Sequence, residues 1–110
     1  MAKELMGHYE CVDENNRSMY IGSSGRPLDK LEWNHRNYFK FKDGYGSDFR
    51  KALRAHGANW TFRWIQEPRE ISRVQAEIEE GVLIRMYKPQ LNKDKYPYET
   101  SVRLKRMEQV

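Results

Sequence analysis

The sequence is poor in cysteine and in apolar runs. Cys11 is its only cysteine, so no disulfide forms within the chain, and a reducing cytoplasmic environment is expected. A small buried residue on a strand explains Cys11 better than a nucleophile does. No segment approaches the roughly 20 apolar residues that a membrane-spanning helix needs. The first residues lack the apolar core of a secretory signal, so we expect no membrane association.

Several common catalytic patterns are also missing. The sequence has no HExxH or CxxC pair and no acidic cluster with EF-hand spacing. The segment Gly22-Ser23-Ser24-Gly25 lacks the following Gly-Lys-Ser/Thr of a phosphate-binding P-loop, and no serine stands in a nucleophile elbow. These absences argue against zinc proteases, P-loop nucleotide hydrolases and α/β hydrolases.

The composition allows one small domain. Hydrophobic residues make up 38% of 110 residues and aromatic residues 13%, so we expect Trp33, Trp60 and Trp64 to fill much of a small core. Lys and Arg number 20 against 16 Asp and Glu, for a net charge of +4. This modest excess is compatible with a polyanionic partner but does not require one.

The hydrophobic pattern predicts six elements in the order β-β-α-α-β-α. Strands are expected over residues 7–12, 17–22 and 60–66, and helices over residues 28–42, 47–57 and 70–87. This order predicts an α/β (α+β) fold, a small three-stranded mixed or antiparallel sheet flanked by helices. Residues 1–92 form the predicted domain, and residues 93–110 are a basic C-terminal extension rather than a second domain.

Local signals place the ends of these elements. Ser47 is the expected N-cap of the second helix, whose inner face includes His56 beside Phe49, Ala52 and Leu53. Pro68 is expected to stop the third strand, so that the last helix begins at about residue 70. Pro89 ends that helix.

Glu80 is the first candidate for chemistry. It lies on the same helical stripe as Ile84, so its carboxylate is expected at the border of the core, where it needs a partner. Mg²⁺ commonly takes one or two protein carboxylates together with waters and phosphate oxygens. The alternative is an ordinary solvated helix carboxylate, since Glu77 and Glu79 stand nearby.

Two tyrosines and a histidine are the other candidates. The predicted hairpin places Tyr9 and Tyr20 on one face of the sheet, where a nearby cation would lower the pKa of a phenol and let it orient or deprotonate a water. His35 on the first helix is a candidate for proton transfer or for donation to a phosphate. Packed tyrosines with hydroxyls at the rim and a helix-face histidine remain the structural alternatives.

Gly7-His8-Tyr9 comes first along the chain, and Tyr20-Ile21-Gly22 follows and continues into Ser23-Ser24. In this order the motifs resemble those of the GIY-YIG nuclease family: Gly7-His8-Tyr9 is similar to the GIY element with His in the middle, and Tyr20-Ile21-Gly22 matches the YIG element. The remaining similar positions are His35, Phe49, Leu53, His56-Gly57, Phe62, Ile65-Gln66-Glu67, Glu80 four residues before Ile84, Lys88-Pro89 and Asn92. The resemblance covers residues 7–92.

One position departs from the family pattern. The family has a catalytic arginine about one turn before the first-helix histidine, but Leu31 stands there, or Lys30 when counted from Gly22. Arg26 and Arg36 are close in sequence. Arginine offers phosphate a rigid fork and lysine a point charge, so either Lys30 or a neighbouring arginine takes this role, or the activity is weakened.

The resemblance implies a metal-dependent DNA endonuclease of phage or mobile-element type, in a bacterial or phage-infected cell. Glu80 would bind one Mg²⁺ or Mn²⁺, Tyr9 would orient or activate water, and Tyr20, His35 and Lys30 would support the phosphate. Arg26, Lys30, Arg36 and Asn92 are the expected nucleic-acid-binding residues, with Asn92 more a brace than a reactant. The expected partner is double-stranded DNA.

Other readings stay open at this point. A catalytically silent nucleic-acid-binding or accessory module on the same fold is the main alternative, and the displaced arginine favours it. An unrelated basic domain without an active site is the third. The sequence leaves the oligomeric state undecided, although a dimer would supply two active sites for cutting both strands.

Overall fold

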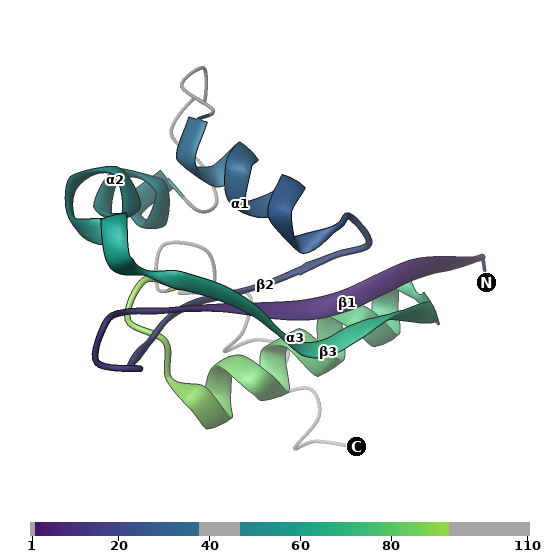
Figure 1. Cartoon of the computed structure of the whole chain (residues 1–110). Helices are drawn as coiled ribbons and strands as arrows, with labels where there is room; N and C mark the ends of the chain where they lie inside the picture. The colour runs from purple at the N-terminus through teal and green to yellow at the C-terminus, as the bar shows by residue number, and fades with distance from the viewer. Residues whose placement is uncertain (1, 38–46, 93–110) are drawn as a thin grey trace.

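The computed structural model describes residues 2–37 and 47–92, and it confirms the small α+β fold (Figure 1). The elements are β1 (Lys3–Val12), β2 (Ser18–Ser24), α1 (Leu28–Asn37), α2 (Ser47–His56), a short 3₁₀ turn (Gly57–Asn59), β3 (Thr61–Ser72) and α3 (Arg73–Tyr87). The strands form one antiparallel sheet in the order β2-β1-β3. The predicted order of elements is therefore confirmed. Residues 38–42, the end of the first predicted helix, the side chain of Ser47 and the extension 93–110 lie outside the described residues.

The sheet separates two layers of helix. Figure 1 shows α1 and α2 on one face of the sheet and α3 on the other. Alternate residues of β1 contact the two helical layers, because successive side chains of a strand point to opposite faces of the sheet. Tyr9 and Cys11 pack into the core under α1 and α2, whereas His8 reaches Glu79 on α3. No helix within the described ranges is both long enough and apolar enough to cross a membrane.

The core lies between the sheet and the α1–α2 layer. Leu31 on α1 and Phe49 and Leu53 on α2 are buried against Tyr20 and Phe62 from the strands. Cys11 is fully buried there, as expected, and burial raises the pKa of its thiol to about 12. A thiol in that state is protonated at neutral pH and is a poor nucleophile.

The prediction that Pro68 ends the third strand is wrong. β3 continues through Pro68 to Ser72, and α3 begins only at Arg73, with the Ser72 hydroxyl accepting from the Gln75 amide at 3.1 Å. β3 is an edge strand, where proline removes no essential ladder bond. The pairing of β1 with β3 is irregular between Met6 and His8, and a Cβ on Gly7 would lie 2.7 Å from the Pro68 nitrogen. Gly7 therefore gives the proline ring room inside the sheet.

Two predicted core positions are also wrong. Trp33 is 63% exposed, although Trp60 is buried and Trp64 is partly buried. At 100° per residue, Trp33 points away from the α1 face that buries Leu31 and His35. His56 is exposed because α2 ends there and the chain turns into Gly57–Asn59.

Candidate functional site

Tyr9 and Tyr20 lie side by side on the α1–α2 face of the sheet. Tyr9 pairs with Gly22 and Cys11 pairs with Tyr20, so the two tyrosines are diagonal neighbours with ring centroids 6.3 Å apart. A Cβ on Gly22 would overlap the Tyr9 hydroxyl, so only glycine lets this phenol lie across β2. The prediction that Tyr9 and Tyr20 share one face of the sheet is confirmed. The close approach of the Tyr9 ring explains sterically why the Tyr20-Ile21-Gly22 motif ends in glycine.

His35 connects the tyrosines to the helices. Its Nε2 lies 2.8 Å from the Tyr9 hydroxyl, and Arg50 of α2 donates from Nε to His35 Nδ1 at 3.3 Å. A guanidinium only donates, so Nδ1 accepts and Nε2 carries the hydrogen that is donated to the Tyr9 oxygen. The Tyr9 hydroxyl proton is then directed toward a different acceptor. The arrangement forms a hydrogen-bonded row from Arg50 through His35 to Tyr9.

The environment keeps Tyr9 protonated. Burial raises the pKa of the Tyr9 phenol well above its ordinary value, the charges of Tyr20 and Glu80 raise it further, and the Arg50 charge opposes them. At neutral pH the phenol is therefore a hydrogen-bond donor rather than a base. Its use as a base would need an additional cation close by.

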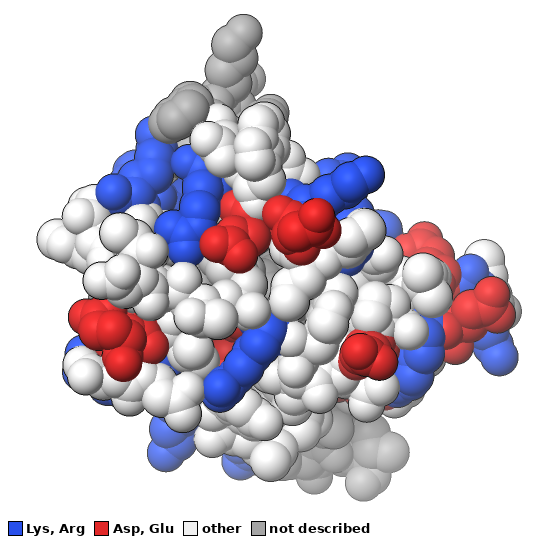
Figure 2. All heavy atoms as spheres, viewed as in Figure 1, with Lys and Arg blue, Asp and Glu red and all other residues white. Residues whose placement is uncertain are grey.

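These residues line an open pocket of about 320 Å³. Its lining comes from both strands of the hairpin, from the turn after β2, and from α1 and α2: Tyr9, Tyr20, Ser23, Ser24, Arg26, Leu31, Asn34, His35 and Arg50. Arg26 and Arg50 contribute two positive charges beside two phenols and an imidazole. Figure 2 shows Lys and Arg side chains over α1 and α2 in the upper part of the viewed face, with acidic groups between them, and further basic side chains over the rest of that face. Such a pocket suits an anionic group of phosphate size.

Glu80 does not line this pocket. It is 5% exposed on α3, which covers the other face of the sheet, yet its charge is near enough to raise the pKa of Tyr9. Among the described residues no group of three or more His, Cys, Asp or Glu side chains is arranged to hold a metal ion. Glu80 is thus a single buried carboxylate within electrostatic reach of Tyr9.

The basic residues near the site differ in what they contact. Lys30 lies in a neighbouring pocket that shares Arg26. Arg36 is used by the fold, since it donates to the Glu32 carboxylate and to the Gly57 and Trp60 carbonyls at 2.9 Å each. Sequence reasoning missed Arg50, because the phosphate-binding basic residue was sought on or beside the first helix. Its only sequence signal is its place next to Phe49 on the inner side of the second predicted helix.

Asn92 holds the outer edge of β2. Its side-chain oxygen accepts from the Ile21 amide and its side-chain nitrogen donates to the Ile21 carbonyl, both at 2.8 Å, and the residue is 2% exposed. The backbone amides of Gln90 and Leu91 continue this pairing to the Ser18 and Met19 carbonyls. Asn92 therefore positions the strand that carries Tyr20 and does not offer its amide to a ligand.

A second polar chain, on the α3 side of the sheet, also escaped the sequence analysis. His8 is 1% exposed, with Nδ1 2.8 Å from the Ser23 hydroxyl and Nε2 3.0 Å from Glu79. Arg69 and Gln75 donate to the same carboxylate. A carboxylate only accepts, so His8 Nε2 donates to Glu79, and Nδ1 shares a hydrogen bond with the Ser23 hydroxyl. This chain ties α3 to the wall of the pocket at Ser23.

Comparison with models of known protein families, with curated proteins and with solved structures gives no match.

Proposed function

We propose that this protein is a metal-dependent endonuclease that hydrolyses DNA phosphodiester bonds by GIY-YIG-type chemistry, in the cytoplasm of a bacterial or phage-infected cell. The observation that carries the proposal is the convergence of Tyr9, Tyr20, His35 and two arginines on one pocket. Tyr9, Tyr20 and His35 belong to motifs that are separated along the chain, and in the fold their side chains line the same pocket.

The phosphate would bind at the two guanidinium groups. Arg50 is already oriented by its bond to His35, and Arg26 approaches the same pocket from the turn before α1. Guanidinium groups recognise phosphate oxygens with two parallel hydrogen bonds, which fixes orientation as well as charge. Arg50 thus takes the role for which Lys30, Arg26 and Arg36 were considered, with Arg26 as its partner.

Tyr9 would position the attacking water. Because its oxygen accepts from His35 Nε2, the remaining phenol proton can be donated to a water or to a phosphate oxygen. Tyr20 presents a second ring and hydroxyl beside it, and the buried setting strengthens each interaction with the developing charge.

In this proposal Mg²⁺ or Mn²⁺ would be held through one carboxylate, that of Glu80, although Glu80 does not line the pocket. Glu80 is buried and its charge acts on Tyr9, and Mg²⁺ typically uses one or two carboxylates plus waters and substrate phosphate. When bound, the cation would supply Lewis-acid stabilisation and a more acidic water. The raised pKa of Tyr9 makes such a cation useful, since the phenol alone is a poor base.

A silent nucleic-acid-binding module is the second candidate. Two observations favour it: the Glu80 side chain does not line the pocket, and the raised pKa of Tyr9 keeps its phenol protonated at neutral pH. Such a module would retain the basic pocket and bind DNA without cleaving it.

Cleavage of supercoiled plasmid with Mg²⁺ or Mn²⁺ tests the proposal. We expect nicked or linear product from the parent protein and at least a ~100-fold lower rate for Glu80→Gln, which removes the metal-binding charge. Glu70→Gln, at an exposed position on β3, is the matched control and should cleave as the parent does. No cleavage by the folded parent protein, together with retained DNA binding in EDTA, would overturn the nuclease in favour of the silent module.

A further inference from the structure

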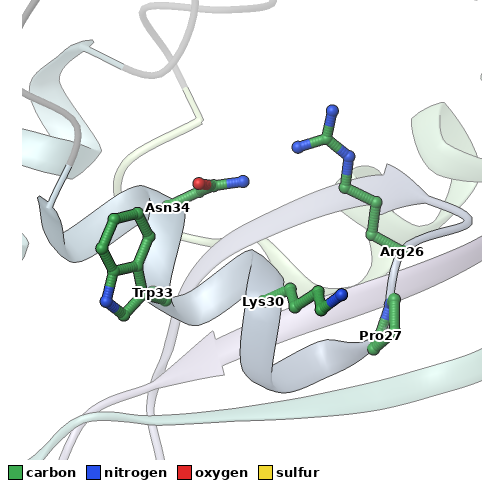
Figure 3. A pocket seen from close by; sticks show the side chains of 5 residues that line it. All are labelled: Arg26, Pro27, Lys30, Trp33 and Asn34. Carbon is green, nitrogen blue, oxygen red and sulfur yellow. The ribbon is translucent and has the colours of Figure 1, made fainter.

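A second pocket adjoins the first along α1. It has a volume of about 450 Å³ and is lined by Arg26, Pro27, Lys30, Trp33 and Asn34 (Figure 3). Arg26 and Asn34 line both pockets, so the second opens beside the first. Figure 3 shows the Trp33 ring and the Lys30 ammonium on the same stretch of α1, with the Arg26 guanidinium across the hollow. A ligand in the first pocket can therefore extend directly into the second.

Among the described residues, Trp33 belongs neither to the core cluster nor to the side chains packed against it. Its side chain is 63% exposed, and its helix buries the opposite face through Leu31 and His35. Within the part of the chain that the structure describes, neither Arg26 nor Lys30 forms an ion pair with a carboxylate. The nearby Glu32 is engaged by Arg36 at 2.9 Å. The pocket thus combines one large exposed aromatic surface with two cations that have no carboxylate partner among residues 2–37 and 47–92.

We propose that this second pocket binds an unpaired nucleobase, stacked on Trp33, with the flanking phosphates on Lys30 and Arg26. An indole next to cations is the combination that binds single-stranded nucleic acid, because every base has a face that stacks and every nucleotide has a phosphate. A base inside a duplex has both faces covered by its neighbours and cannot stack on a side chain unless it is extruded.

This inference rests on the proposed function and names its substrate class. With the scissile phosphate at Arg50 and Arg26, the neighbouring nucleotide occupies the Trp33 pocket. The substrate is then DNA that carries an unpaired nucleotide beside the cut, such as a flap, a fork or a gap in a duplex. Asn34, between the two pockets, offers an amide to the edge of that base.

Fluorescence anisotropy in EDTA tests the pocket without any cleavage. The probes are a labelled (dT)12 strand, a blunt duplex of equal length and a 12-residue strand of abasic tetrahydrofuran units. We expect the parent to prefer (dT)12 over the abasic strand. We expect Trp33→Ala to weaken (dT)12 binding about 5- to 150-fold, as the ~1–3 kcal/mol of one stacked base predicts at 1.4 kcal/mol per tenfold. Trp33→Phe should restore part of the affinity.

The abasic strand separates stacking from charge. Trp33→Ala should leave binding of the abasic strand and the duplex within about twofold, whereas Lys30→Ala should weaken all three probes and reduce the dependence on salt. Tyr87→Ala, at an exposed aromatic residue on α3, is the matched control and should change nothing. If Trp33→Ala weakened binding of the abasic strand as much as binding of (dT)12, the proposed base pocket would be overturned. The same would follow if Trp33→Ala weakened binding of neither strand.

The result is independent of the nuclease test. Loss of the (dT)12 preference in Trp33→Ala would support the base pocket even for a parent that cuts nothing. Metal-dependent cleavage with a parent that does not distinguish (dT)12 from the abasic strand would leave the nuclease standing and remove the pocket.

Discussion

At the scale of single residues, the guanidinium beside His35 comes from α2, whereas the sequence directed attention to basic residues on or near the first helix. Arg50 of α2 donates to His35 and lines the pocket, whereas Lys30 faces the neighbouring one. A group can bind phosphate if its charge and its planar hydrogen-bond donors lie at the right position. The helix that carries such a guanidinium can therefore differ.

The proposed nuclease function predicts different kinetic effects for Arg50 and Lys30. Arg50→Ala should lower kcat for DNA cleavage about 10²- to 10³-fold, because it removes a donor to the developing charge. Arg50→Lys should recover only part of this loss, and Lys30→Ala should affect mainly KM. Single-turnover and steady-state rates measure both. Thermal unfolding must be matched among the variants, since Arg50 also orients His35. An effect of Lys30→Ala on kcat as large as that of Arg50→Ala would contradict this assignment.

At the scale of elements, α3 is attached to the sheet by a partly buried chain of polar side chains. Glu79 accepts from His8 of β1 and from Arg69 of β3, and His8 in turn reaches Ser23 of β2. All three strands therefore meet the helix through one carboxylate. Partial burial would by itself raise the pKa of Glu79, but hydrogen bonds from Gln75, His8 and Arg69 hold it below its ordinary value of 4.5.

This attachment predicts a loss of stability in acid. A group with a lowered folded pKa stabilises the protein above its unfolded value, and that contribution disappears as the pH falls through the folded value. The free energy of unfolding should therefore decrease below about pH 4.5, and Glu79→Gln should reduce the steepness of that decrease. Urea unfolding between pH 7 and pH 3 measures the difference. Glu70→Gln, at an exposed position, should follow the parent; the prediction fails if Glu79→Gln does so too.

The boundary between β3 and α3 shows how an element can override a local signal. Proline is a reliable stop for a strand only when the strand needs the missing amide. At the sheet edge it does not, and Gly7 on β1 leaves space for the ring. The sequence contains both residues, but their apposition is a matter of strand register, which no local pattern specifies.

At the scale of the whole molecule, the segment after α3 closes the edge of the sheet. Gln90, Leu91 and Asn92 pair with Ser18, Met19 and Ile21, so backbone groups far apart in the chain satisfy one another. An unpaired strand edge is open to association with other chains. Along this part of β2 the edge is covered, and the covered strand is the one that carries Tyr20.

Removing the Asn92 side chain, which hydrogen-bonds to both backbone groups of Ile21, should destabilise the fold. Asn92→Ala leaves the buried amide and carbonyl of Ile21 without their partners, which should cost about 2–4 kcal/mol in the free energy of unfolding. Gln90→Ala is the matched control, because its side chain is exposed and its contact to Ser18 is made by the backbone. Urea denaturation measures both. Equal stability of the two variants would show that the Asn92 clamp is not needed to hold β2.

The sequence by itself determined the order of the elements, the shared face of Tyr9 and Tyr20, the burial of Cys11 and the place of His35 on the first helix. These follow from side-chain periodicity and turn chemistry, which act over a few residues. Only the tertiary structure decided that β3 passes through Pro68, that Trp33 is exposed, that Arg50 joins the tyrosine pocket and that His8 meets Glu79. Each of these depends on which segments the fold brings into contact, and such contacts arise from packing over the whole chain rather than from any local pattern.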